Sequence, residues 1–83
     1  MGYNLSSPVE ALMIEIGVGC GYIIDDADAA RAMLTRTFES ADEFIDAYFT
    51  ACGRDPALII NRERRLLRAR VEKWLEFPSS PHA

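Results

Sequence analysis

The chain has little histidine or cysteine, and this scarcity excludes several kinds of active site. Its only histidine, His82, lies in a tail that we expect to be frayed, so neither a histidine-based hydrolase triad nor most zinc sites can be assembled. Its two cysteines, Cys20 and Cys52, share no short metal or redox spacing, and nothing else is typical of a secreted disulfide scaffold. We therefore expect both thiols to be reduced and buried, and the chain to be cytoplasmic.

Long hydrophobic runs and targeting signals are also missing. Residues 11–24 are almost uncharged, but the run is too short to cross a bilayer and contains Glu15. Residues 1–5 show no basic region before an apolar one, so we expect no secretory signal. The 83 residues are predicted to form a single helical domain, 1–83, with a short disordered tail at 79–83 and no membrane role.

Nucleotide and metal motifs are absent as well. The glycines of segment 17–21 lack the spacing of either glycine-rich nucleotide motif and have no Lys-Ser/Thr pair. They either let another helix pack closely or end the first helix in a turn. Asp25, Asp26 and Asp28 lack the glycine and the later glutamate of a calcium loop, so helix capping explains them better. We predict no catalytic, cofactor-binding or metal-binding residue, and no enzyme.

The sequence is rich in helix start signals. Capping boxes begin at Ser7 and Ser40, and Asp55-Pro56 offers a cap followed by a proline at the first helical position. The fold class predicted is all-α, a compact bundle of four helices at roughly 8–23, 26–38, 41–52 and 56–77. No segment alternates apolar and polar residues for long enough to indicate a strand.

The first predicted helix is apolar on more than one face. One stripe consists of Val9, Leu12, Met13, Ile16, Cys20, Ile23 and Ile24, and a second of Ala11, Ile14, Val18 and Tyr22. A helix that is apolar on most sides is buried on most sides. Either it lies centrally among the other helices, which we favour, or its second face contacts a partner subunit.

Charge is divided unevenly along the chain. Residues 1–55 carry ten carboxylates and three arginines, whereas residues 56–83 carry six basic side chains and three carboxylates. Such polarity can steer a binding partner. The net charge of −4 and the pI near 4.8 weigh against general affinity for nucleic acid, because phosphate binding depends on positive charge.

The last predicted helix separates apolar from basic side chains. Its apolar side carries Ile59, Ile60, Leu66, Leu67, Val71, Trp74 and Phe77, and its basic face carries Arg62, Arg64, Arg65, Arg68 and Lys73. That face is either a solvated surface with Arg68 paired to Glu72, or a docking surface for an acidic protein, or a contact for nucleic acid. Glu63 and Arg70 point into the apolar side, so each could pair with a charge on another helix, or Glu63 of one copy could meet Arg70 of a second copy in a homodimer.

The nucleic-acid interpretation has a geometric difficulty. The short connection between the second and third helices resembles a helix-turn-helix, whose recognition helix would expose three carboxylates, Asp42, Glu43 and Asp46. These could form an alternative acidic interface. We expect a small non-enzymatic regulatory or adaptor protein that acts by binding another protein. In one version of this interpretation it inhibits that partner. The alternative is a DNA- or RNA-binding regulator that uses the basic face of the last helix.

Overall fold

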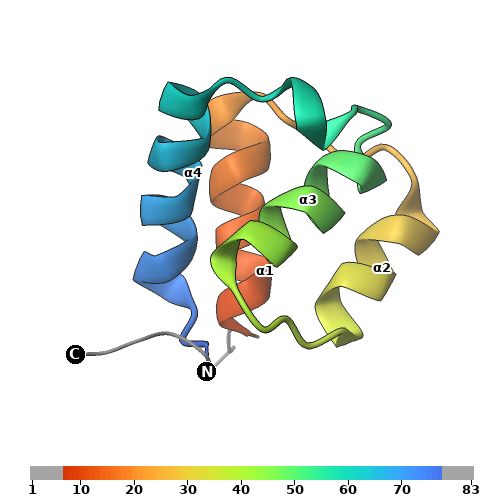
Figure 1. Ribbon diagram of the computed structural model, residues 1–83. Helices are drawn as coiled ribbons and strands as arrows, with labels where there is room; N and C mark the ends of the chain where they lie inside the picture. The colour runs from red at the N-terminus through yellow and green to blue at the C-terminus, as the bar shows by residue number, and fades with distance from the viewer. Residues whose placement is uncertain (1–6, 78–83) are drawn as a thin grey trace.

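The computed structural model describes residues 7–77, and within them it contains four α-helices and no strand (Figure 1). The helices are α1, Pro8–Ile14, which continues as the π-helical segment η1, Glu15–Gly19; α2, Ala27–Thr35; α3, Ala41–Ala51; and α4, Asn61–Trp74. A short 3-10 helix, η2, spans Pro56–Leu58. The predicted all-α fold of four helices, with the last the longest, is confirmed. The predicted tail at 79–83 lies outside the described residues.

Side-chain caps start the first three helices close to the predicted positions. The hydroxyl oxygen of Ser7 accepts from the amide of Glu10 at 3.2 Å, and that of Ser40 accepts from the amide of Glu43 at 3.1 Å. Asp26 accepts from two amides in the first turn of α2. These caps satisfy amides that have no partner inside the helix, which is why the start signals located the helices well.

Other boundaries differ from the prediction. The second helix ends at Thr35 instead of 38, and Phe38, in the loop that follows, is buried in the core. Asp55 caps only η2, because the backbone is extended at Ile59 and Ile60, so α4 begins at Asn61. At its other end α4 stops at Trp74, three residues early.

The glycine-rich segment 17–21 both continues and ends the first helix. The helix widens into the π-helical turns of η1, and the chain then reverses at Gly21, whose φ of +84° favours glycine. Tyr48 of α3 holds this end in place, because its hydroxyl donates to the carbonyl oxygen of Tyr22 at 2.6 Å. A β-carbon on Gly17 would meet the Tyr48 hydroxyl oxygen at 3.5 Å, which is ordinary contact.

α3 contributes more residues to the core than any other element. In Figure 1, α1 lies between α4 and α2, and α3 packs against α4 and α2. The buried core consists of Leu12, Ile16, Met33, Phe38, Ala41, Phe44, Ile45, Tyr48, Phe49, Leu67 and Val71. The predicted burial of the second face of α1 is wrong, because Ile14 is 57% and Val18 79% exposed. Of the predicted apolar side of the last helix, only Leu67 and Val71 are fully buried.

Candidate protein-docking surface

The acidic face of α3 and part of the basic face of α4 neutralise each other. Arg64 contacts Asp42 at 3.2 Å and Asp46 at 2.9 Å, and Arg68 contacts Asp42 at 3.1 Å. Arg64 also donates to the carbonyl oxygen of Pro56 at 3.1 Å. Arg68 thus reaches across to α3 instead of pairing with Glu72 along its own helix. Two arginines predicted to bind a partner, and two carboxylates of the alternative acidic interface, therefore join α3 to α4.

These contacts favour the charged forms of the Asp42 carboxylate and the Arg64 guanidinium. Burial raises the pKa of Asp42, but hydrogen bonds from Arg68 and Arg64 outweigh it and leave the pKa below its ordinary value. The hydrogen bond to Asp46 raises the pKa of Arg64. Both partners are consequently ionised at neutral pH, and this part of the predicted basic face carries little uncompensated charge.

The predicted intersubunit pair, Glu63 and Arg70, is not brought together within the chain. Arg70 contacts Glu15 of η1 at 2.6 Å, and the indole of Trp74 donates to the same carboxylate at 2.8 Å. Hydrogen bonds from Trp74 and Arg70 lower the pKa of Glu15. Glu63 instead accepts from the hydroxyl of Tyr22 at 3.1 Å. Arg70 thus pairs with a charge on another helix, as the sequence allowed, whereas Glu63 pairs with an uncharged hydroxyl outside the helices.

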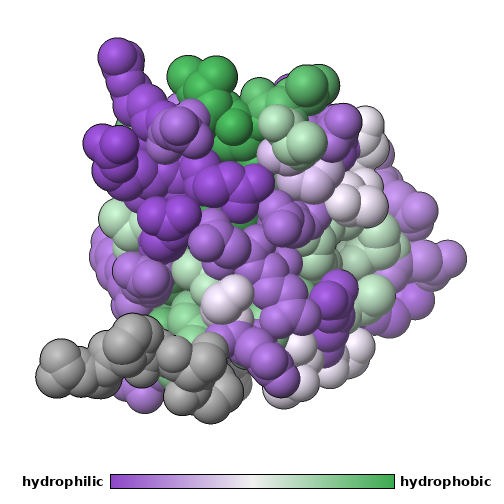
Figure 2. Space-filling model, in the orientation of Figure 1, coloured by the Kyte–Doolittle hydropathy of each residue, from purple (hydrophilic) through white to green (hydrophobic). Residues whose placement is uncertain are grey.

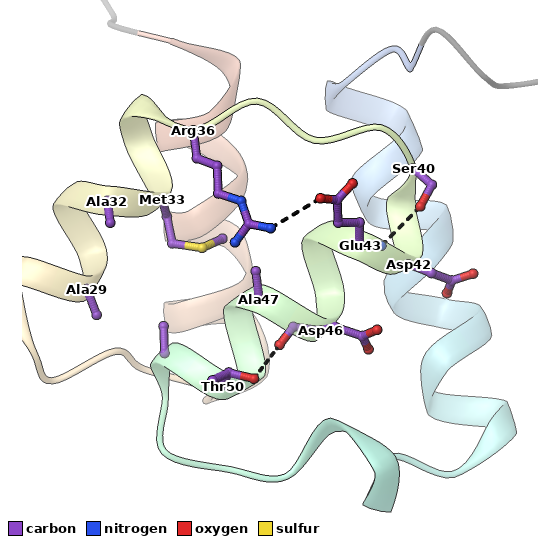
Figure 3. Close-up of a pocket in the computed structure, with 11 residues that line it drawn as sticks. Ala29, Ala32, Met33, Arg36, Ser40, Asp42, Glu43, Asp46, Ala47 and Thr50 are labelled. Carbon is purple, nitrogen blue, oxygen red and sulfur yellow. Dashed lines mark hydrogen bonds and ion pairs between the residues drawn. The ribbon is translucent and has the colours of Figure 1, made fainter.

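The third residue of the acidic interface, Glu43, lies at a groove between α2 and α3. Its carboxylate contacts Arg36 at 3.1 Å, while Asp42 and Asp46 point away toward α4 (Figure 3). The groove has a volume of about 670 Å³, and its lining combines four alanines and Met33 with polar and charged side chains. Its main charges already have partners, so it offers little to a charged ligand. Among residues 7–77, no group of three or more histidine, cysteine, aspartate or glutamate side chains is placed to hold a metal ion.

Arg62 and Arg65 retain uncompensated charge. Both are exposed, and within residues 7–77 neither forms an ion pair. Lys73 is exposed and lies over the ring of Trp74, 5.9 Å from its centroid. The basic face predicted from sequence therefore divides into arginines that join α3 to α4 and cations that face solvent.

An exposed apolar surface lies in the segment that leads into α4, a few residues before Arg62 and Arg65. Leu58 is 77% and Ile60 66% exposed, and beside them a hollow of about 510 Å³ is lined by Tyr22, Phe49, Gly53, Arg54, Asp55, Ile59 and Glu63. Figure 2 shows hydrophobic side chains gathered along the upper edge, where Figure 1 places η2 and the start of α4, with hydrophilic side chains next to them. We call Leu58, Ile60, Arg62 and Arg65 the η2–α4 corner.

Sequence analysis missed the apolar half of this corner. A continuous helix from 56 placed Ile59 and Ile60 together on the core side. The extended backbone at these two residues turns Ile59 inward and leaves Ile60 exposed. The signal was available, because three consecutive apolar residues, Leu58 to Ile60, cannot all lie on one face of a helix.

A second exposed apolar surface lies between the first helix and α2. Ile14, Val18, Ile23 and Leu34 are 57%, 79%, 60% and 41% exposed, and with their neighbours they line a groove of about 280 Å³. We call these four residues and the groove they border the α1–α2 groove. It contains the exposed part of the second apolar stripe of the first helix.

The two cysteines are free, and both are only partly buried, so the expected burial is incomplete. Burial raises the pKa of the Cys52 thiol, which keeps it protonated at neutral pH and weakens it as a nucleophile. Cys20 follows η1, and Cys52 ends α3.

Residues 7–77 contain no helix of the length and hydropathy needed to cross a membrane. The sequence matches no protein-family model, and neither a curated protein nor a solved structure is significantly similar to it.

Proposed function

We propose that this chain is a non-enzymatic adaptor or regulatory protein that binds an acidic protein partner through the η2–α4 corner. The observation that carries the proposal is that two exposed aliphatic side chains, Leu58 and Ile60, are followed within a few residues by two exposed arginines, Arg62 and Arg65, that form no ion pair within residues 7–77. The buried centre of a protein–protein interface is more apolar than the rest of the surface, and arginine is enriched in such interfaces.

The apolar pair contributes affinity, and the arginines contribute orientation. Fully burying a large aliphatic side chain gains about 1.5–3 kcal/mol, so covering the exposed parts of Leu58 and Ile60 gains roughly 2–4 kcal/mol in total. Association costs at least about 4 kcal/mol, so further contacts are required. Arg62 and Arg65 supply them by binding carboxylates bidentately, which also selects acidic partners.

Several features favour a protein partner over nucleic acid. Arg64 and Arg68 are held by the carboxylates of α3, so a phosphate backbone would have to compete with Asp42 and Asp46. The chain as a whole is acidic, which opposes binding to phosphates. The exposed side chains of Leu58 and Ile60 can be buried against apolar side chains of a partner protein. A regulator that covers an acidic site on its partner in this way would act as its inhibitor.

The test is affinity capture with three variants of the full chain. The unmodified protein and Val18→Asp, which alters the other apolar surface, should retain the same defined partner. Leu58→Asp and the double variant Arg62→Glu, Arg65→Glu should each recover at least tenfold less of this partner. Equal recovery with all variants would place the interface elsewhere. Recovery of nuclease-sensitive nucleic acid, lost only in the arginine variant, would instead support the DNA- or RNA-binding function.

A further inference from the structure

We infer that the α1–α2 groove is the contact surface between two copies of this chain. Its four edge side chains, Ile14, Val18, Ile23 and Leu34, are between 41% and 79% exposed, and all are aliphatic. Scattered exposed apolar residues are ordinary on a protein surface, but a contiguous group that borders a groove marks an interaction site. This surface does not overlap with the η2–α4 corner, so the inference stands independently of the proposed function.

The shape of this surface suits a second copy. Ile14 and Val18 are four residues apart along the first helix, and Ala30 and Leu34 are four apart along α2, so each pair forms a ridge along its helix. The groove between the ridges is lined by Met13, Gly17 and Ile24. In a two-fold arrangement, the Ile14–Val18 ridge of one copy enters the groove of the other, and the same contact is made in return.

Charge also selects a second copy as the occupant. A two-fold contact brings the residues at its axis next to their own counterparts, so a charge at the centre of the contact meets the same charge. Of the residues that line the groove, only Glu10 is ionisable at neutral pH, and it is exposed at one end of α1. The η2–α4 corner has the opposite property: two copies joined there would bring Arg62 and Arg65 of each copy together. The uncharged surface therefore suits self-association, and the basic surface suits a different protein.

A small domain gains from such a contact. A chain of this length buries a smaller fraction of its surface than a larger one, and self-association is a common way of compensating. The fold already covers the core face of the first helix, where Leu12 and Ile16 are 0% and 1% exposed. A second copy would cover the opposite face, which is the alternative that the second stripe of the sequence left open.

Sedimentation equilibrium of the unmodified chain and two matched variants tests the inference. Val18 and Leu58 are both aliphatic and are 79% and 77% exposed, so aspartate at either position disturbs the monomer to a similar extent. The unmodified chain and Leu58→Asp should sediment as dimers with closely similar dissociation constants. Val18→Asp should raise the dissociation constant at least a hundredfold. A monomer at every concentration, or a dimer lost in Leu58→Asp and retained in Val18→Asp, would overturn the inference.

Two further variants separate a lost contact from a damaged fold. Ile23 lies outside the helices and is 60% exposed, so Ile23→Asp should also give a monomer while its circular dichroism stays helical. Val18→Leu keeps an aliphatic side chain on the same ridge, so it should remain a dimer with a dissociation constant close to that of the unmodified chain. A monomer for Val18→Leu, or a dimer for Ile23→Asp, would overturn the inference.

Discussion

Replacing Asp42 by asparagine should weaken the contact between α3 and α4 without changing the shape of the side chain. Asp42 accepts hydrogen bonds from both Arg64 and Arg68, so one substitution removes the charge that both guanidinium groups share. Arg64 keeps Asp46 and the carbonyl of Pro56 as partners, which limits the loss. The variant therefore tests the ion pairs themselves, with little change in packing.

The expected cost is modest because the cluster is partly solvated. The Asp42 side chain is 49% exposed, and those of Arg64 and Arg68 are 21% and 40% exposed. Pairs of this exposure contribute about 0.2–1 kcal/mol each, so two of them give about 1 kcal/mol at neutral pH. In a domain of this size that corresponds to a fall in Tm of about 4–8 °C.

The difference in stability between Asp42→Asn and the unmodified chain should disappear in acid. The folded state holds the pKa of Asp42 below its ordinary value of 3.8, so its carboxylate contributes stability above about pH 4. This contribution is lost as the pH falls through the lowered pKa, where asparagine and protonated aspartate become equivalent. High salt should reduce the difference at neutral pH, because half-exposed charges are screened.

Urea denaturation at neutral pH and at about pH 2 measures both effects. Glu72→Gln is the control, since it removes one carboxylate from an exposed position of α4 and should change stability by less than about 0.5 kcal/mol. No loss of stability in Asp42→Asn at neutral pH would contradict the assignment of these pairs. A loss of equal size in acid would show that shape or packing, and not charge, is responsible.

Three further predictions concern Tyr48 of the core and two glycines. Tyr48→Phe should cost about 1–3 kcal/mol in urea denaturation, because the carbonyl of Tyr22 loses its 2.6 Å donor; an unchanged midpoint would contradict this hydrogen bond. Burial raises the pKa of Tyr48 to about 12 from 10.0. The protonated hydroxyl of Tyr48 should therefore contribute its full stability below about pH 10 and lose it as the pH rises through about 12. Tyrosinate absorbance would follow this ionisation. Gly53→Ala should cost about 1–2 kcal/mol of stability, because Gly53 has a φ of +79° that alanine rarely adopts. Gly19 has no positive φ and open space around it, so Gly19→Ala should stabilise the protein by up to about 1 kcal/mol. Equal effects of the two substitutions on Tm would refute this distinction.

The parts of the fold that the sequence predicted well depend on local interactions. Ser7 and Ser40 bind amides three residues away, so the start signals appear in a few consecutive letters. The apolar face of α3 is equally local, and its predicted core residues Phe44 and Tyr48 are buried. These features do not depend on which helix lies opposite.

The ion-pair partners of the charged side chains could not be predicted in the same way. Arg70 pairs with Glu15, 55 residues earlier, and nothing in the spacing distinguishes that carboxylate from the others. Similarly, the exposure of Ile60 follows from an extended turn between η2 and α4, not from helical periodicity. The candidate site is thus a product of tertiary packing, which pairs some arginines with α3 and leaves Arg62 and Arg65 facing solvent.

Photo-crosslinking from two positions tests the central claim, that the two apolar surfaces have different occupants. A photoreactive amino acid is placed either at Leu58 or at Val18 of the full chain, and the adducts are identified by mass spectrometry. Position 58 should yield an adduct with a different, acidic protein, and position 18 an adduct of two copies of this chain. Self-adducts alone at position 58, or no self-adduct at position 18, would contradict the account.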